Sequence, residues 1–190
     1  MIRNDEIADR IRENARVNAA LVPQADLIRR IAEQWLECLR LGGKILLFGN
    51  GGSAADAQHI ATELSGRFYK DRPGIAALAL SVNTSALTAI GNDFGFDAVF
   101  VRQLEGIGRA GDVAVGISTS GRSESVLAAL RKARALGLAT TGFTGRAGGA
   151  MPPLVDLCLR IDSEETPRIQ EGHILAGHIV CELVEREMFP

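Results

Sequence analysis

The apolar positions along the chain follow two successive rhythms. From about residue 5 to residue 41 they recur every three or four residues, which predicts two helices, at about 5–20 and 24–41. Beyond residue 44, short runs that are apolar at nearly every position take over, and helix-length segments separate most of them. Such runs are typical of strands covered on both faces of a sheet. The predicted strands are 44–48, 76–80, 113–117, 139–143 and 157–161.

This alternation predicts an α/β fold, a three-layer sandwich with a parallel sheet between helices. A last helix, about 168–187, is apolar on more than one stripe, which favours burial on several faces and a subunit interface. With 190 residues, 46% of them apolar, the chain suits one compact domain. We therefore expect a single domain over 1–190, with N-terminal helices at about 5–41, an α/β core at about 44–162 and the C-terminal helix at about 168–187.

Composition narrows the classes of partner. A net charge of −2 gives no basic surface for nucleic acid, and aromatic residues make up only 5% of the chain. The charged N-terminus lacks the apolar core of a signal peptide, and no stretch offers the roughly 20 apolar residues of a membrane span. We expect a cytoplasmic protein with a small-molecule ligand, no nucleic acid and no membrane. Trp35 and the widely spaced Cys38, Cys158 and Cys181 are interpreted as core residues.

Two polar loops follow predicted strands. The first, GNGGS at 49–53, leads into a helix expected from about Ala54; its glycines expose backbone amides beside a helix N-terminus, where a phosphate binds well. The alternative is a plain turn with Ser53 as the N-cap. The second loop, STSGRSES at 118–125, leads into a helix expected from about Glu124. Its hydroxyls suit one phosphate monoester, and the alternative is a turn rich in capping residues. Because ligands bind at the carboxyl ends of parallel strands, two such loops suggest a small phosphorylated substrate.

The histidines suggest a third part of a site. His59 and Glu63 are four residues apart on the helix after the first loop, so they share a face and can ligate a metal or act as acid and base. By itself such a pair is common on solvated helices. The other two histidines, His173 and His178, lie together in the last helix, which indicates a joint site formed by the two helices.

Several motifs in one order resemble the sugar isomerase (SIS) domain family, in particular its phosphoheptose isomerases. They are GNGGSAADAQH, GNDFGF at 91–96, GDVAVGISTSGRS at 111–123, TGRAGG from Thr144 and RIQEGH at 168–173, and the resemblance spans about residues 30–188. It implies a five-stranded parallel sheet of flavodoxin-like order, a homotetramer with active sites between subunits, and conversion of sedoheptulose 7-phosphate to D-glycero-D-manno-heptose 7-phosphate for lipopolysaccharide or other surface glycans.

The resemblance also implies roles for individual residues. Glu63 and His178 match the acid/base pair of the family, and Arg67 matches an active-site arginine. The zinc ligands of part of the family correspond to His59, Glu63, Gln170 and His178. The phosphate nest corresponds to Ser118, Thr119, Ser120 and Ser123, and further substrate contacts correspond to Asn50, Gly51, Gly52, Ser53, Asn92 and Asp93, with Glu63 and Gln170 also counted as substrate-binding. Pro167 stands where some relatives have an acidic residue.

Ketose–aldose exchange requires the chemistry of such residues. A base removes a proton from the carbon beside the carbonyl, an enediol forms, and a proton returns to the neighbouring carbon, roles that Glu63 and His178 would fill. Coordination to zinc lowers the proton affinity of Glu63, so the metal is an organiser or a Lewis acid whose ligand shifts. Gln170 and His178 are eight residues apart, about 12 Å along a helix, which is near the limit for sharing one ion.

Three other interpretations stay open. One is a non-catalytic relative that binds the bacterial replication initiator, although such proteins tend to lose the equivalents of Glu63 and His178. A second is an isomerase for another phosphosugar, because nothing in the sequence measures the length of the sugar. A third treats the loops as relics in an interface protein.

Overall fold

Five parallel strands form the centre of the molecule. The computed structural model describes residues 2–190. The strands are β1 (Ile45–Gly49), β2 (Ala77–Ala79), β3 (Val113–Ile117), β4 (Ala139–Gly145) and β5 (Leu157–Ile161). They pair in the order β2-β1-β3-β4-β5, every pair parallel. This order confirms the predicted flavodoxin-like α/β sandwich. In this fold β2 is added on one side of β1 and the later strands are added on the other side, so the strand order switches beside β1.

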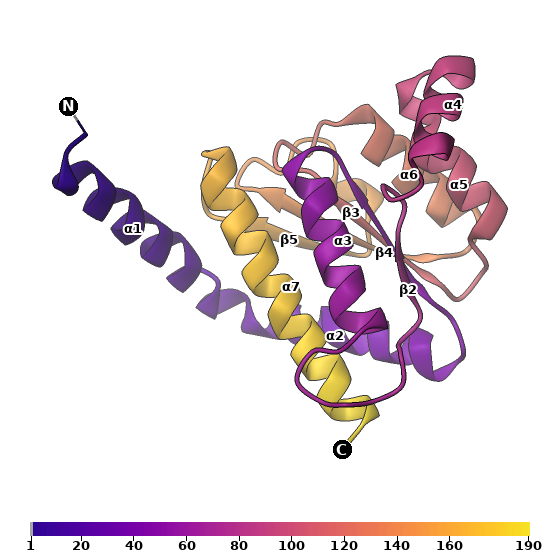
Figure 1. Cartoon of the computed structure of the whole chain (residues 1–190), viewed down its shortest axis with the longest axis horizontal. Coiled ribbons are helices and arrows are strands. Elements are labelled where there is room, and N and C mark those ends of the chain that lie inside the picture. The colour runs from indigo at the N-terminus through magenta and orange to yellow at the C-terminus, as the bar shows by residue number, and fades with distance from the viewer. Residues whose placement is uncertain (1) are drawn as a thin grey trace.

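Helices cover both faces of this sheet, as Figure 1 shows. On one face lie α2 (Ala25–Arg40), α3 (Gly52–Ser65) and α7 (Thr166–Met188), and on the other lie α5 (Val99–Ile107) and α6 (Glu124–Ala135). Alternate residues of β1 divide between the two layers: Ile45 and Leu47 pack with the first set, Leu46 and Phe48 with the second. Burial on both faces explains why the strands are apolar at nearly every position.

The predicted elements begin and end within two residues of the observed ones, including β4, which ends two residues later than predicted. The first helix, α1, runs over Asn4–Ala19, and the short 3-10 helix η1 (Val22–Gln24) joins it to α2. Helix α7 begins two residues before the prediction and ends one residue after it. Trp35, Cys38 and Cys181 are buried and Cys158 is half-buried, with all three thiols free, so their interpretation as packing residues is confirmed.

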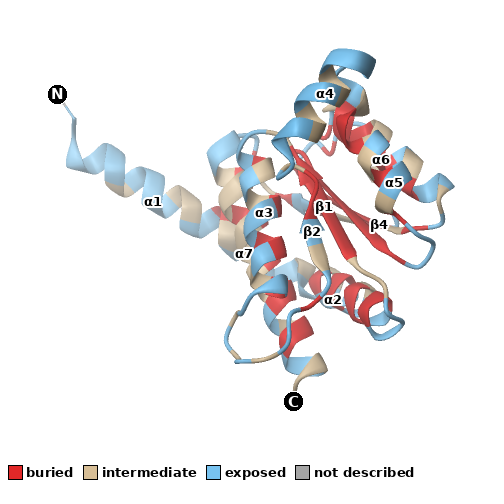
Figure 2. Ribbon diagram, turned by 45° about the vertical axis from the view of Figure 1, so that its right-hand side comes forward, coloured by how far each residue is buried: buried red, intermediate tan, exposed pale blue. Residues whose placement is uncertain are grey.

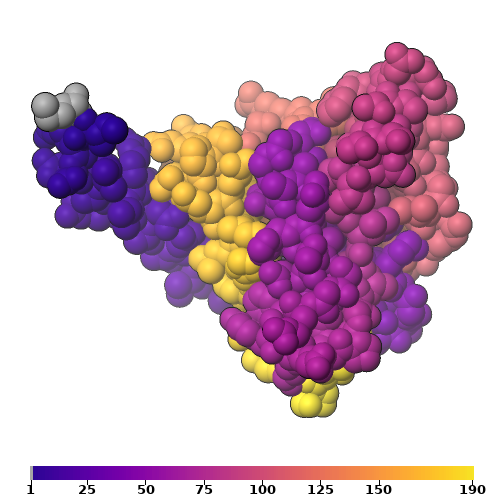
Figure 3. Space-filling model, in the orientation of Figure 1, coloured from indigo at the N-terminus to yellow at the C-terminus, as the bar shows by residue number. Residues whose placement is uncertain are grey.

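Two helices lie at the margins of the body. Helix α1 projects from it as an arm that is mostly exposed (Figures 2 and 3). Helix α4 (Thr84–Phe94) buries no residue, and a 3-10 turn, η2 (Phe96–Ala98), connects it to α5; another, η3 (Pro152–Leu154), precedes β5. Between residues 2 and 190, no helix has the length and apolarity that a membrane crossing needs.

Candidate active site

The first loop is a tight glycine turn from β1 into α3. Gly51 is the N-cap and has a φ of 56°, a left-handed value that favours glycine, and the helix begins at Gly52. Ser53 is already inside the first turn; it is buried, and the residue that precedes the helix has no side-chain cap. The helix therefore begins two residues before the predicted start near Ala54, because the glycines let the chain turn earlier, and the alternative with Ser53 as N-cap is wrong.

The second loop is stabilised by hydroxyls and by another glycine. Ser118 is buried, and its hydroxyl lies 3.1 Å from the hydroxyl of Ser123, the N-cap residue of α6. Gly121 has a φ of 61°, and a Cβ there would lie 1.9 Å from the carbonyl oxygen of Gly148. Helix α6 begins at Glu124, as the sequence predicts. The partly exposed Thr119 and Ser120 line a hollow of about 190 Å³.

Sequence reasoning assigned no role to three charged residues around this hollow. Arg122, Arg146 and Glu164 line it, and Arg146 pairs with Asp162 at 2.7 Å. Arg122 was visible within the STSGRSES motif as the one cation among hydroxyls. Arg146 lies in the quoted TGRAGG motif directly after β4, but the motif does not show that this residue reaches the loop after β3.

A hydrogen bond joins the two loops. The Asn50 side-chain amide donates to the Ser125 hydroxyl at 3.0 Å, across the neighbouring strands β1 and β3. The prediction that the loops converge at the carboxyl edge of the sheet is therefore confirmed. Ser125 is the partner that sequence reasoning missed, although it is the last residue of the quoted motif.

Gln170 reaches the first loop from α7. A Cβ built on Gly52 would lie 2.1 Å from the Gln170 side-chain nitrogen, so the amide lies directly against the start of α3. Glycine at position 52 is what allows this approach. The place of Gln170 in a ligand set with His178, eight residues further along α7, stays a prediction.

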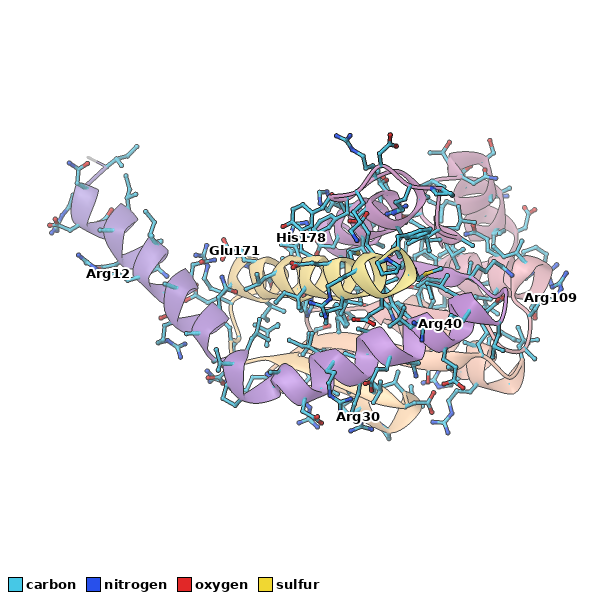
Figure 4. The ribbon with its side chains drawn as sticks, turned by 90° about the horizontal axis from the view of Figure 1, so that it is seen from below. Arg12, Arg30, Arg40, Arg109, Glu171 and His178 are labelled. Atoms are coloured by element: carbon cyan, nitrogen blue, oxygen red, sulfur yellow. The ribbon has the colours of Figure 1, made fainter. Side chains whose placement is uncertain are left out.

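Three side chains converge further along the same pair of helices. His59 Nε2 lies 2.8 Å from His178 Nε2 and 3.1 Å from Glu63 Oε1. One ligand atom from each of the three residues lies within 4.8 Å of the others. Figure 4 labels His178 on α7, well away from Arg12 on the projecting arm. The sequence prediction of a joint site formed by α3 and α7 is thus confirmed for these three residues.

The donor atoms of this cluster suit a shared cation. A single proton on His59 Nε2 satisfies only one of its two close contacts, whereas nitrogen and carboxylate donors together are a set that Zn²⁺ prefers. One turn earlier on α3, burial raises the pKa of Asp56 to about 6, partly opposed by His59. One oxygen of that carboxylate is buried without a hydrogen-bond partner among residues 2–190.

Known proteins share this fold and much of this sequence. The SIS domain family model matches residues 11–145. A phosphoheptose isomerase from Roseiflexus is 58% identical over 87% of this chain and 84% of its own. One from Burkholderia pseudomallei is 52% identical over 96% of this chain and 94% of its own. A solved phosphoheptose isomerase from Neisseria gonorrhoeae superposes with a TM-score of 0.91, at 43% identity, covering 96% of this chain and 98% of its own.

The chain belongs to the SIS domain family, in its phosphoheptose isomerase branch. The family model covers most of the chain, and the relatives extend over nearly all of it. These matches confirm the resemblance that the loop motifs carry.

Three predicted residues of this SIS domain do not join the cluster within one copy. Arg67 is exposed just beyond the end of α3. Asn92 and Asp93 lie on the exposed α4, where the Asn92 amide donates to the Asp93 carboxylate at 2.8 Å. In the part of the chain that the structure describes, no hydrogen bond joins any of these side chains to the two loops. Their assignment to the site stays a prediction.

His173 has a separate role. It is buried, and its Nε2 donates to the carbonyl of Thr144 at 3.2 Å, while its Nδ1 has no partner among residues 2–190. Burial lowers its pKa to about 4, against the effect of the Thr144 carbonyl. This histidine anchors α7 to β4 and does not contribute to the cluster.

Proposed function

We propose that this protein is the isomerase that converts sedoheptulose 7-phosphate to D-glycero-D-manno-heptose 7-phosphate. The observation that carries the proposal is the His59–Glu63–His178 cluster on α3 and α7, because α3 begins at the first loop and that loop is hydrogen-bonded to the residue that ends the second. High identity to proteins named phosphoheptose isomerase over almost the whole chain supports the same substrate. Glu63 and His178 are both present, which argues against the initiator-binding alternative.

Glu63 is assigned as the base. Its carboxylate removes a proton from C1 of the open-chain ketose as the enediol forms and returns a proton to C2 as the aldose forms. His178, 2.8 Å from His59, donates a proton to the C2 carbonyl oxygen in the first step and accepts the proton of the C1 hydroxyl in the second; in an earlier step the same group donates to the ring oxygen when the sugar opens. A carboxylate and an imidazole on facing helices can act on opposite ends of one enediol.

The loops are assigned to the phosphate and the sugar hydroxyls. Ser118, Thr119, Ser120 and Ser123 hold the phosphate next to the N-terminus of α6, whose dipole favours an anion. The loop at Asn50 to Ser53 contacts the sugar, and Gln170, Arg67, Asn92 and Asp93 complete the contacts. Binding energy from the distant phosphate then orients the reacting carbons.

Zinc fits the cluster. His59, Glu63 and His178 would hold it, with Gln170 as the fourth residue that we propose. The metal, when bound, would supply Lewis acidity that polarises the substrate oxygens. The convergence of two imidazole nitrogens and a carboxylate oxygen supports this assignment.

We further propose a cytoplasmic homotetramer. Residues Asn92 and Asp93 lie on α4, which buries no residue within one copy, so a second copy would bring such a surface to the site. The product would feed synthesis of the heptose of lipopolysaccharide or another surface glycan.

The proposal is tested by mixing the purified protein with sedoheptulose 7-phosphate, with and without added zinc, and following the aldose by NMR. We expect turnover in the wild type and a loss of at least 10²-fold in Glu63→Gln, since general base catalysis contributes that much. Glu37→Gln is the matched control and should stay active, because it makes the same change from carboxylate to carboxamide at an exposed position on α2.

The oligomeric state of Glu63→Gln is measured alongside. An intact tetramer without activity supports the assigned base, whereas a dissociated tetramer contradicts it. Absence of turnover in the wild type under both conditions would overturn the substrate and favour another phosphosugar.

A further inference from the structure

The segment between α3 and β2 is bound by one carboxylate from the last helix. Glu185, near the end of α7, accepts hydrogen bonds from the backbone amides of Phe68, Tyr69 and Lys70 at 3.3, 2.9 and 3.0 Å. Its side chain is 2% exposed. Burial raises the pKa of Glu185, but these amides and the Arg72 guanidinium outweigh it, so the pKa lies below its ordinary value. A charged, buried carboxylate therefore organises this segment.

Arg72 completes the connection back to α3. Its Nε donates to Glu185 at 2.9 Å, and its side chain is also 2% exposed. The two terminal nitrogens donate to the carbonyl oxygen of Glu63 at 2.8 Å and to that of Leu64 at 2.6 Å. These carbonyls belong to the last turn of α3, where a helix leaves its carbonyls unpaired and a cation is favourable.

The pair thus connects the two helices that carry the cluster. Glu63 is anchored through its own carbonyl, and Glu185 lies seven residues after His178 on α7, about 10 Å along the helix. The segment that the pair holds also places the Phe68 ring 5.9 Å from the His178 ring. Glu63 and His178 come from different helices, so their separation depends on how those helices are held at this end.

We propose that Arg72 and Glu185 are positioning residues that set the spacing of His59, Glu63 and His178. The inference rests on the proposed function for its kinetic part only. Neither residue touches the substrate in this assignment; they act through the Glu63 backbone and through α7. Supporting contacts of this kind change metal affinity or activity by roughly 10–100-fold when removed.

The test compares two buried carboxylates of similar surroundings. Glu185→Gln removes the charge of the proposed positioning residue. Asp112→Asn is the matched control. Asp112 is equally buried, pairs with Lys44 and accepts hydrogen bonds from the backbone amides of Lys44 and Arg109. It connects the starts of β1 and β3, at the opposite ends of these strands from the loops. Arg72→Lys is the second positioning variant. Lysine keeps the positive charge but lacks the guanidinium group, which donates hydrogen bonds to Glu185 and to the two carbonyls at once.

Three measurements are made on the full chain: the melting temperature, the Co²⁺ dissociation constant from the absorption of the bound ion, and kcat and KM for sedoheptulose 7-phosphate. We expect Glu185→Gln and Arg72→Lys to weaken Co²⁺ binding about 10-fold or more and to lower kcat by a similar factor, with KM within about 2-fold. Asp112→Asn should lose thermal stability while its Co²⁺ affinity and kcat stay at the wild-type level.

Equal Co²⁺ affinity in the wild type and both positioning variants would overturn the inference, as would equal losses in Asp112→Asn. If Glu185→Gln does not fold, the inference is tested with Arg72→Lys alone, by the same changes in Co²⁺ affinity and kcat. A wild type that binds Co²⁺ with this pattern but does not isomerise the substrate would support the positioning role and reject the proposed function.

Discussion

At the scale of single residues, two glycines in the loops serve different purposes. Gly121 has a left-handed φ, and a side chain there would collide with the backbone of Gly148. Gly52 has no such backbone requirement, and a side chain there would meet only the end of the Gln170 side chain. Gly121 is therefore needed for the fold of the second loop, whereas Gly52 is needed for the position of the Gln170 amide against the first loop.

This difference predicts opposite outcomes for two alanine substitutions. Gly52→Ala should keep the melting temperature near that of the wild type, because alanine suits a helix and the Gln170 side chain can move. It should lower kcat/KM by at least 10-fold if Gln170 contributes to the site. Gly121→Ala should destabilise the protein by about 2–5 kcal/mol through left-handed strain and overpacking.

Thermal unfolding and steady-state kinetics check both variants. Full activity in Gly52→Ala would contradict a role for Gln170 in the first loop, and an unaltered melting temperature in Gly121→Ala would contradict the strain argument.

At the scale of elements, helix α7 contacts the first loop, β4, α3 and the segment after α3. Gln170 meets the first loop, His173 bonds to β4, His178 meets α3, and Glu185 binds the segment after α3. The apolar pattern of the sequence predicted this helix, and the sequence shows that the helix carries His173 and His178. The partners could not be predicted in the same way: Arg72 with Glu185 and Asn50 with Ser125 are tertiary pairs, and a pattern along one segment contains no information on which side chain of another segment meets it.

The bond between α7 and β4 predicts a dependence of stability on pH. The pKa of His173 falls from 6.5 to about 4 on folding, because burial disfavours the imidazolium. Below pH 6.5 the unfolded chain binds a proton that the native state excludes, so this residue lowers stability progressively from pH 6.5 to pH 4, by about 3 kcal/mol in all. Asp56, with a raised pKa of about 6, contributes in the opposite direction.

The contribution of His173 is therefore measured as a difference. Urea unfolding of the wild type and of His173→Gln is followed from pH 7 to pH 4 in metal-free buffer; glutamine keeps a donor toward the Thr144 carbonyl and does not titrate. We expect the wild type to lose stability relative to the variant as the pH falls. A constant difference across this range would show that His173 is protonated in the native state.

At the scale of the whole molecule, the spacing of apolar runs predicted the parallel sheet, the family resemblance implied its strand order, and the apolar last helix suggested a subunit interface, but the extent of the exposed apolar surfaces was not predicted. A groove of about 430 Å³ runs between the start of α2 and α7 and includes Val22, Ile179 and Leu183. The α1 arm exposes Ile7 and Ile11, and the region of α4 exposes Phe94 and Phe96. The apolar pattern of a helix shows which of its faces avoids water. It does not show whether the surface that covers this face belongs to the same copy of the protein or to another.

Exposed apolar surfaces are typical of interaction sites, and the proposed tetramer would place a second copy on this groove, so the proposal predicts the effect of a charge placed there. Val22 is 74% exposed in one copy, and a glutamate there should leave the isolated fold intact while burying an unpaired charge if a second copy covers the groove. We expect Val22→Glu to shift the mass from tetramer to a smaller species in light scattering, with an unchanged circular dichroism spectrum. Val22→Ile is the control and should remain tetrameric.

Activity decides whether the site needs the neighbouring copy. Since Asn92 and Asp93 do not reach the loops within one copy, the dissociated Val22→Glu protein should isomerise sedoheptulose 7-phosphate at least 10-fold more slowly than the control, even with zinc present. A dissociated variant with full activity would mean that one copy holds a complete site and that these two residues do not belong to it. A variant that stays tetrameric would instead place the subunit contact away from this groove, leaving the exposed arm and α4 as the surfaces that the copies share.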